Sequence, residues 1–248
     1  MGSRKMEGVS SYLAVEKFGQ NPAIGTTEES VWDGGGVFPW LGCWQAGAVQ
    51  VTLISDSVQD SPAGTRAGHI RVYGLDDGGR LIQEDVTLSA TFTVTSINTF
   101  SFVYRMHSLE VGGTGDVSNG GNILMRPVGS GFDGALIRPG FGQTQMAQYV
   151  IPTGMVGILK SIYGASDQTG GATSARFTLH ARDGYGFGWR NRFTLNAATG
   201  LFTQYIFPFP VVTFPAGSHI DMHCISDAAG GTVVDGGFSL ELVSGQVR

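Results

Sequence analysis

The sequence predicts an all-β protein in which two packed, jelly-roll-like β-sandwiches follow an extended N-terminal arm. Glycine is abundant, with 39 of 248 residues, and only 14% of residues are charged. Short runs rich in valine, threonine and phenylalanine recur along the chain and alternate with polar residues. Branched and aromatic side chains fit a pleated sheet, and glycine fits the tight turns between short strands. An apolar share of 42% argues against global disorder.

Composition also excludes two kinds of partner, nucleic acids and membranes. The net charge is -5 and no run of Lys or Arg stands out, so no nucleic-acid partner is predicted. No stretch approaches the roughly 20 apolar residues of a membrane helix, so no membrane partner is predicted either. Residues 1–15 lack the apolar core of a signal peptide. Cys43 and Cys224 are predicted to be free thiols of a protein made in a reducing cytosol.

Residues 1–45 are the least regular part and are predicted to form the arm, with at most a short helical turn over 6–18. The arm ends in the aromatic stretch, residues 31–44, which holds three of the four tryptophans, three consecutive glycines and Pro39. Glycine and proline argue against a helix there, and the glycine step argues against a strand. We expect Trp40 and Trp44 to seal the first sandwich, and Trp32 to contact a neighbouring chain.

The first sandwich is predicted over residues 46–140. Alternating apolar and polar residues indicate strands at 48–54, 69–73, 80–88, 91–96, 100–111, 122–128 and 135–138. The cluster Asp76-Asp77-Gly78-Gly79 predicts a hairpin turn, because glycine supplies the positive φ that such turns demand. The run Pro139-Gly140-Phe141-Gly142 is the candidate boundary, and its shortness predicts that the two halves pack together.

The second sandwich is predicted over residues 141–248. The same alternation indicates strands at 145–150, 155–163, 175–182, 189–195, 201–207, 218–226 and 232–243. The two halves share length and rhythm but no close residue-level repeat. The pattern therefore allows two sandwiches in tandem or one sandwich with a large insertion.

His219, Asp221 and His223 are the best candidates for a metal site. They alternate along one strand and so project from one face. Imidazole and carboxylate groups are good ligands for Zn²⁺ and related metals. Three ligands on one straight strand, however, span roughly 13 Å, too far for one ion. Two of them could bind an ion with a ligand from a neighbouring strand, but a solvated or interface face is favoured. No metal and no cofactor is predicted.

Other constellations favour structural roles. Tyr185, Phe187 and Trp189 are interleaved with arginines and are predicted to be core aromatics, with carbohydrate contact or a subunit interface as the alternatives. Cys43 has no basic neighbour to lower its pKa, so a buried apolar role is favoured. No catalytic residue is predicted, and the protein is not expected to be an enzyme.

The segment Val31-Trp32-Asp33-Gly34-Gly35-Gly36-Val37-Phe38-Pro39-Trp40 resembles the start of a family of tailed-bacteriophage virion structural proteins. The resemblance covers most of the chain from residue 18 onward, and its motifs are structural. Further matching segments are residues 74–79 before 86–88, residues 142–145 with 149–154, and residues 236–240.

The resemblance implies a virion component that is assembled in the host cytoplasm. Within that class we expect a capsid decoration or cement protein, because an extended arm rich in rings and glycines suits contact with neighbouring subunits. Its partners would be the major capsid protein or other virion subunits. The chain itself is expected to form a homo-oligomer, with a trimer favoured. The expected partner contacts are Trp32, Gly34, Gly35, Gly36, Phe38 and Trp40. The alternatives are a tail or head-to-tail component (an adaptor, collar or fibre subunit) and a carbohydrate-binding β-sandwich. A host glycan is a further ligand to consider.

Overall fold

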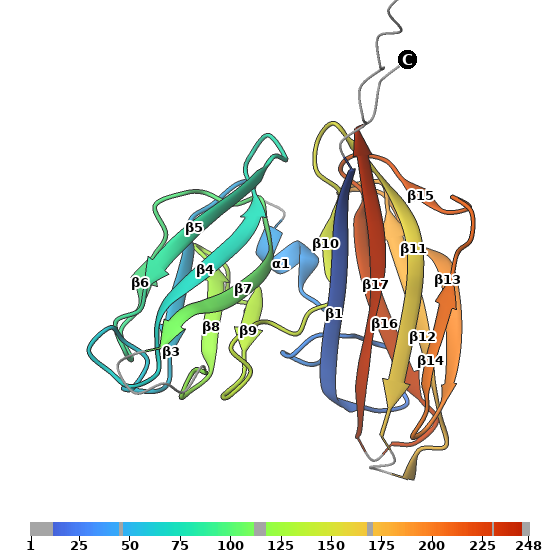
Figure 1. The fold of residues 1–248 in the computed structure, drawn as a ribbon, viewed down its shortest axis with the longest axis horizontal. Coiled ribbons are helices and arrows are strands. Elements are labelled where there is room, and N and C mark those ends of the chain that lie inside the picture. Colours follow the sequence, from blue (N-terminus) through green and yellow to red (C-terminus); the bar gives the residue numbers. More distant parts are fainter. Residues whose placement is uncertain (1–11, 45–46, 112–117, 168–170, 230, 245–248) are drawn as a thin grey trace, which may run out of the picture.

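A computed structural model describes residues 12–44, 47–111, 118–167, 171–229 and 231–244. Its strands form two β-sandwiches that lie side by side (Figure 1). The predicted all-β class with two packed sandwiches is thus confirmed. Within the described ranges the helical content is one short helix, α1 (Trp40–Trp44), and no helix there is long and apolar enough to cross a membrane.

We call the smaller unit the inserted sandwich, because in the sequence its strands lie between strands of the larger one. One sheet has the strand order β6-β3-β8-β9 and the other β5-β4-β7. Its strands are β3 (Val51–Ser55), β4 (Ala67–Leu75), β5 (Leu81–Thr87), β6 (Val94–Thr95), β7 (Phe102–Val111), β8 (Ile123–Pro127) and β9 (Ala135–Ile137). Leu53, Ile70 and Met125 are fully buried between the two sheets. The predicted hairpin is present, since β4 pairs with β5 across the turn that Gly79 closes at φ 70°.

The larger unit is the host sandwich. One sheet has the order β1-β17-β11-β14, with β15 also paired to β11, and the other has the order β10-β16-β12-β13, with β2 also paired to β16. Its strands are β1 (Tyr12–Ile24), β2 (Glu29–Ser30), β10 (Gln148–Val150), β11 (Met155–Ser166), β12 (Ser174–Arg182), β13 (Arg190–Ala198), β14 (Phe202–Ile206), β15 (Thr213–Phe214), β16 (His219–Ser226) and β17 (Thr232–Ser244). Phe177, Met222 and Phe238 are fully buried in its core.

The predicted N-terminal arm is wrong for the part of it that the structure describes before the aromatic stretch. β1 pairs with β17 from Tyr12↔Val243 to Ile24↔Thr232, and β2 pairs with β16. The helical turn expected up to Phe18 is likewise replaced by strand. Because both β1 and β2 belong to the second sandwich, the first sandwich is an insertion between β2 and β10. Residues 1–11 of the predicted arm lie outside the described residues.

The residues on the inward face of β1 explain why the sequence does not predict this strand. Lys17, Gly19 and Asn21 face inward and are buried, yet none of them is a large apolar residue. Gly19 is required by a close approach, because a Cβ there would lie 2.3 Å from the carbonyl oxygen of Val31. A strand without alternating apolar residues gives no period-2 signal, and here its pairing partner lies at the opposite end of the chain.

Candidate functional site

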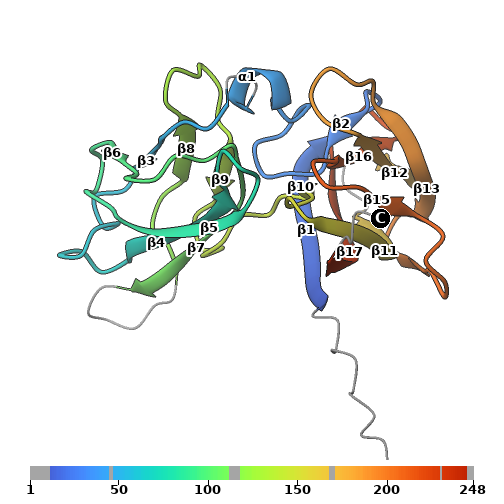
Figure 2. The same ribbon diagram turned by 90° about the horizontal axis from the view of Figure 1, so that it is seen from above.

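The candidate site is the junction between the two sandwiches, where stacked aromatic rings and buried polar side chains lie close together. The aromatic stretch and α1 close one side of this junction, as two perpendicular views show (Figure 1, Figure 2). On another side, β1 of the host sandwich faces β7 of the inserted sandwich across a cleft. We refer to these as the closed side and the open side.

The aromatic stretch begins as an extension of the host sandwich. Val31 N–H donates to the Met222 carbonyl at 2.7 Å, and the Val31 carbonyl accepts from Ala147 N–H at 3.0 Å. Gly35 and Gly36 then turn the chain with φ of 68° and 66°. The expectation that this stretch contains no helix is wrong for its last five residues, which form α1. Pro39 and the consecutive glycines Gly34, Gly35 and Gly36 precede that single turn and therefore do not interrupt it, and Gly42 lies within it.

Trp40 lies between the two sandwiches and contacts both. Its ring stacks on Phe102 of the inserted sandwich at 5.0 Å between centroids with an interplanar angle of 9°. It also stacks on His219 of the host sandwich at 5.0 Å and 24°. Trp44 packs edge-on against the same Phe102 at 5.6 Å. Stacked rings of this kind add to the stability that area burial provides, so Trp40 joins the core of the inserted sandwich to the outer face of the host sandwich.

The burial of these rings decides part of the partner-contact prediction. Trp40 and Trp44 do pack into the core of the inserted sandwich, as expected. Trp32, Phe38 and Trp40 are at most 5% exposed, so their predicted contact with a partner chain is wrong in this structure. They pack on this chain's own sheets, and Trp32 and Phe38 contact each other at 5.1 Å. Partner contact stays a prediction for Gly34, Gly35 and Gly36, which are exposed or partly exposed.

Asp221 is the polar centre of the closed side. It is 1% exposed, and its Oδ2 accepts hydrogen bonds from Trp40 Nε1 at 2.7 Å and Ser30 Oγ at 3.1 Å. Its Oδ1 accepts from Gln148 Nε2 at 2.7 Å. A buried carboxyl group is stable only when it is well hydrogen-bonded. Asp221 therefore fixes the aromatic stretch, β2 and β10 on the outer face of β16.

His219 has a different role from the one the sequence suggested. Its Nδ1 accepts hydrogen bonds from Arg182 Nε at 3.2 Å and Nη2 at 3.1 Å. Burial, together with the nearby Arg182 charge, lowers the pKa of His219 to about 3, so the ring is a neutral acceptor. The Arg182 guanidinium lies 4.8 Å from the ring centre of Tyr185 and 4.6 Å from that of Trp189. Arg182 therefore engages a ring face of Tyr185 and of Trp189. The prediction that Tyr185, Phe187 and Trp189 are core aromatics is wrong, because these residues are 37%, 60% and 37% exposed.

The three predicted metal candidates do not converge. Asp221 and His223 meet at 3.1 Å between Oδ2 and Nε2, whereas His219 is engaged by Arg182 and Trp40. His223 is instead joined by His180 and Glu28, which sequence reasoning missed. Finding them required the register of β12 against β16, which places His180 opposite Asp221.

Two histidines of this group carry opposite shifts. Burial and the neighbouring His223 lower the pKa of His180. Burial also acts to lower the pKa of His223, but the carboxyl groups of Asp221 and Glu28 outweigh it and leave that pKa raised.

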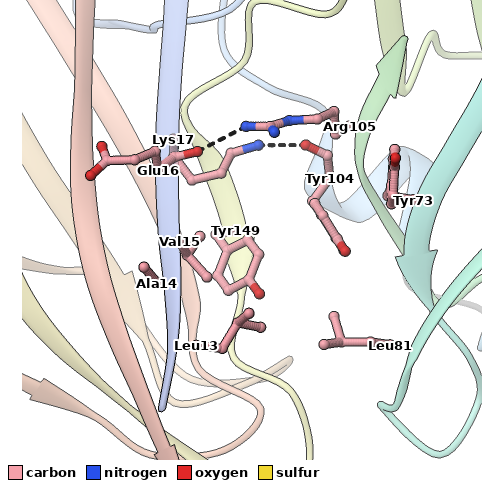
Figure 3. A pocket seen from close by; sticks show the side chains of 10 residues that line it. All are labelled: Leu13, Ala14, Val15, Glu16, Lys17, Tyr73, Leu81, Tyr104, Arg105 and Tyr149. Carbon is pink, nitrogen blue, oxygen red and sulfur yellow. Dashed lines mark hydrogen bonds between the residues drawn. The ribbon is translucent and has the colours of Figure 1, made fainter. Parts of the chain in front are cut away.

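The open side holds a cleft of about 250 Å³ (Figure 3). Its walls come from β1 and β10 of the host sandwich and from the inserted sandwich, with the lining residues Leu13, Ala14, Val15, Glu16, Lys17, Tyr73, Leu81, Tyr104, Arg105 and Tyr149. Two hydrogen bonds cross it, from Lys17 Nζ to the Tyr104 carbonyl and from Arg105 Nη2 to the Glu16 carbonyl at 2.9 Å. Lys17 is only 2% exposed.

Burial shifts the pKa values of three side chains that line the cleft. Burial, followed by the charge of Arg105, lowers the pKa of Lys17 well below its usual range. Burial raises the pKa of Tyr104 to about 12 and raises that of Tyr149 further. The tyrosines therefore keep their protons at neutral pH, and the amine of Lys17 is already engaged by a backbone carbonyl.

The two cysteines are free and buried, as predicted. Burial raises the pKa of Cys43 to about 11 and raises that of Cys224 as well. A nucleophilic cysteine needs the opposite shift, because the thiolate is the reactive form. Both side chains instead contribute to the cores of the two sandwiches.

Comparisons with known proteins leave the family open. No family model and no curated protein matches the chain. Among solved structures, a mitogen from Yersinia pseudotuberculosis is 13% identical, over 41% of this chain and 87% of that one, with a TM-score of 0.20. The mosquito-larvicidal toxin Cry4Aa of Bacillus thuringiensis is 11% identical, over 81% and 52%, with a TM-score of 0.25. Infectious bursal disease virus strain Gx gives 10%, over 96% and 73%, with a TM-score of 0.26. Likenesses this weak carry no argument about function.

Proposed function

We propose that this chain is a structural subunit of a tailed-phage virion, a capsid decoration or cement protein that stabilises the shell through subunit contacts. The observation that carries the proposal is an exposed apolar edge on the host sandwich. The resemblance of residues 31–40 to phage virion proteins supplies the biological setting.

The apolar edge consists of β14 and the residues that flank it, 201–211. Phe207 is buried, but six other large apolar side chains are 45 to 72% exposed, and they are Leu201, Phe202, Tyr205, Ile206, Phe209 and Val211. β14 is the last strand of its sheet and pairs only with β11 in the described part of the chain. Its other edge therefore offers backbone donors and acceptors beside apolar side chains.

An edge of this kind is costly to leave in water. Exposed apolar strand edges promote pairing with other chains, and monomeric proteins usually blunt them with charges or bulges. β14 carries no charged residue, and the prolines at 208 and 210 lie beyond its end. Contiguous exposed apolar patches mark interaction surfaces. The edge thus suits a subunit interface. We propose that a second copy of this chain covers it and that three copies form a trimer.

A position in the tail or at the head-to-tail junction is the alternative within the same class, since it needs the same kind of contact. The carbohydrate-binding alternative is less well supported, because Tyr185 and Trp189 each have a ring face engaged by Arg182. Deleting residues 1–45 cannot separate these alternatives, because it would remove β1 from the host sandwich.

The test is the oligomeric state of the purified chain by light scattering. We expect the wild type to be a trimer, and the double variant Phe202→Ser/Ile206→Ser to be a monomer that keeps the β-sheet signal of the wild type and melts cooperatively at a temperature no longer dependent on concentration. The matched control is Phe92→Ser/Ile97→Ser, which removes a phenylalanine and an isoleucine that are more exposed, 72% and 86% against 63% and 66%, from the inserted sandwich. A monomeric wild type, or equal loss of assembly in both double variants, would overturn the proposal.

The copy number in a reconstructed virion then separates decoration from tail. Copies that match the major capsid protein indicate decoration, whereas copies that form a single ring indicate an adaptor or collar. Absence of the chain from purified particles would contradict both.

A further inference from the structure

A cluster of two histidines and a glutamate lies on the outer face of the host sandwich, next to the closed side of the junction. His180 Nε2 is 3.5 Å from Glu28 Oε1, and the rings of His180 and His223 are 4.6 Å apart. Each of the three residues offers one ligand atom, and these atoms lie within 4.8 Å of one another. All three side chains are partly buried, between 16 and 37% exposed.

Backbone pairing holds the cluster together. β12 and β16 are neighbours, and His180 lies opposite Asp221, so it is the diagonal neighbour of His223 on the same face. β2 pairs with the other side of β16, with Ser30 opposite His223, and Glu28 immediately precedes β2. The three strands lie side by side in Figure 2. The ligands therefore come from three adjacent segments whose register is fixed.

Asp221 supports the cluster from beneath. Its Oδ2 lies 3.1 Å from Nε2 of His223, and its own position is fixed by Trp40 and Ser30. Metal-binding histidines commonly use one ring nitrogen for such a carboxyl group, which orients the ring and leaves the other nitrogen for the ion. This arrangement distinguishes the cluster from a chance meeting of surface side chains.

We propose that Glu28, His180 and His223 bind a divalent transition-metal ion of the Zn²⁺ class, with water completing its coordination. Two imidazole nitrogens and one carboxylate oxygen suit Zn²⁺ or Co²⁺ and disfavour Mg²⁺ and Ca²⁺, which prefer oxygen alone. Bonds of about 2.1 Å in a tetrahedron place ligand atoms about 3.4 Å apart. The pair His180 and Glu28 already meets that separation, and the partly exposed Glu28 can adjust.

The ion would tie the loop between β1 and β2 to the sheet of β12 and β16. It would thus reinforce, from the solvent side, the same contacts that Asp221 and Trp40 make from the buried side. This role is independent of the virion proposal, because it concerns one chain alone.

The test is titration of the metal-free full chain with Co²⁺, followed by visible absorption and by calorimetry. We expect one equivalent to bind with the absorption of tetrahedral Co²⁺, and Zn²⁺ to displace it. Glu28→Gln and His180→Gln should each weaken binding at least about tenfold. His107→Gln, which removes a histidine from β7 in the inserted sandwich, should bind as the wild type does.

Thermal melting of each metal-free variant shows whether weakened metal binding results from loss of the fold. Glu28→Gln is the decisive variant, because Glu28 is the most exposed ligand and its change preserves shape. Failure of the wild type to bind one equivalent, or wild-type affinity in a folded Glu28→Gln, would overturn the proposal. A loss in His107→Gln equal to that in His180→Gln would overturn it too.

Discussion

The closed and open sides of the junction join the same two sandwiches by different means. On the closed side, Trp40 is 4% exposed, stacks on a ring from each sandwich and donates to the buried Asp221. On the open side, Lys17 and Arg105 donate to backbone carbonyls around a cleft. One side combines apolar burial with a buried, fully hydrogen-bonded carboxyl group, and the other relies on polar contacts to backbone carbonyls around a cleft.

The difference shows where the stability of the junction resides. Burial of large aromatic rings and charge-assisted hydrogen bonds in a dry environment contribute strongly, whereas polar contacts near water exchange for contacts with water. We therefore expect substitutions on the closed side to cost most and those at the rim of the open side to cost least.

The largest effect is expected for Trp40→Ala. The change removes a buried indole between Phe102 and His219 and takes one donor from Asp221. We expect a loss of about 3–5 kcal/mol in the free energy of unfolding. Urea denaturation measures it, and Trp40→Phe, which keeps the stacking, should lose less. A loss below about 1 kcal/mol would mean that the closed side does not hold the sandwiches together.

A pH-dependent effect is expected for Lys17→Met on the open side. Because burial and Arg105 lower the pKa of Lys17, the unfolded chain binds a proton that the folded chain does not, between the lowered pKa and the usual value of about 10.4. The contribution of Lys17 to the free energy of unfolding should therefore rise with pH in that window, against the opposite contribution of the two buried thiols, whose pKa values are raised. Lys17→Met should flatten the rise.

Denaturation from about pH 7 to pH 9 measures this difference, below the range where tyrosines titrate. Lys160→Met is the matched control, because Lys160 is 45% exposed on β11 and should leave the slope as in the wild type. Equal slopes in the wild type and Lys17→Met would show that the Lys17 amine is charged in the folded chain.

The smallest effect is expected for Arg105→Ala. Arg105 donates to the Glu16 carbonyl in an exposed position and lies over the Phe18 ring at 5.6 Å. Contacts of this kind near water are worth about 1 kcal/mol or less. Urea denaturation should therefore show only a small loss, and a loss as large as that of Trp40→Ala would remove the contrast between the two sides.

Much of the fold was predictable because it is encoded locally. Val51 and Leu53 alternate with polar neighbours and form β3, and the Asp76–Gly79 cluster forms the turn between β4 and β5. Each such signal needs only a side-chain period of two or a residue that accepts positive φ. The sequence predicts the strands of both sandwiches downstream of residue 48 in this way, except for the two-residue β15.

The candidate site was predictable only in part. His219, Asp221 and His223 do share a strand, but their roles depend on what packs against each of them. Trp40 contacts His219 and Asp221 from nearly two hundred residues away in the sequence, and His180 reaches His223 through strand pairing. No local sequence pattern predicts these long-range contacts.

The sequence by itself determined the β class, the strand periods, the turns and the concentration of rings in residues 31–44, because these depend on short-range sterics and on side-chain type. Tertiary structure alone decided that β1 pairs with β17, that the first sandwich is an insertion and that Asp221 lies beneath Trp40. The physical reason is that pairing between distant strands follows from the total burial and hydrogen bonding of the whole chain. Lys17, an inward residue of β1, finds its partner, the Tyr104 carbonyl of β7, only once both sandwiches are assembled.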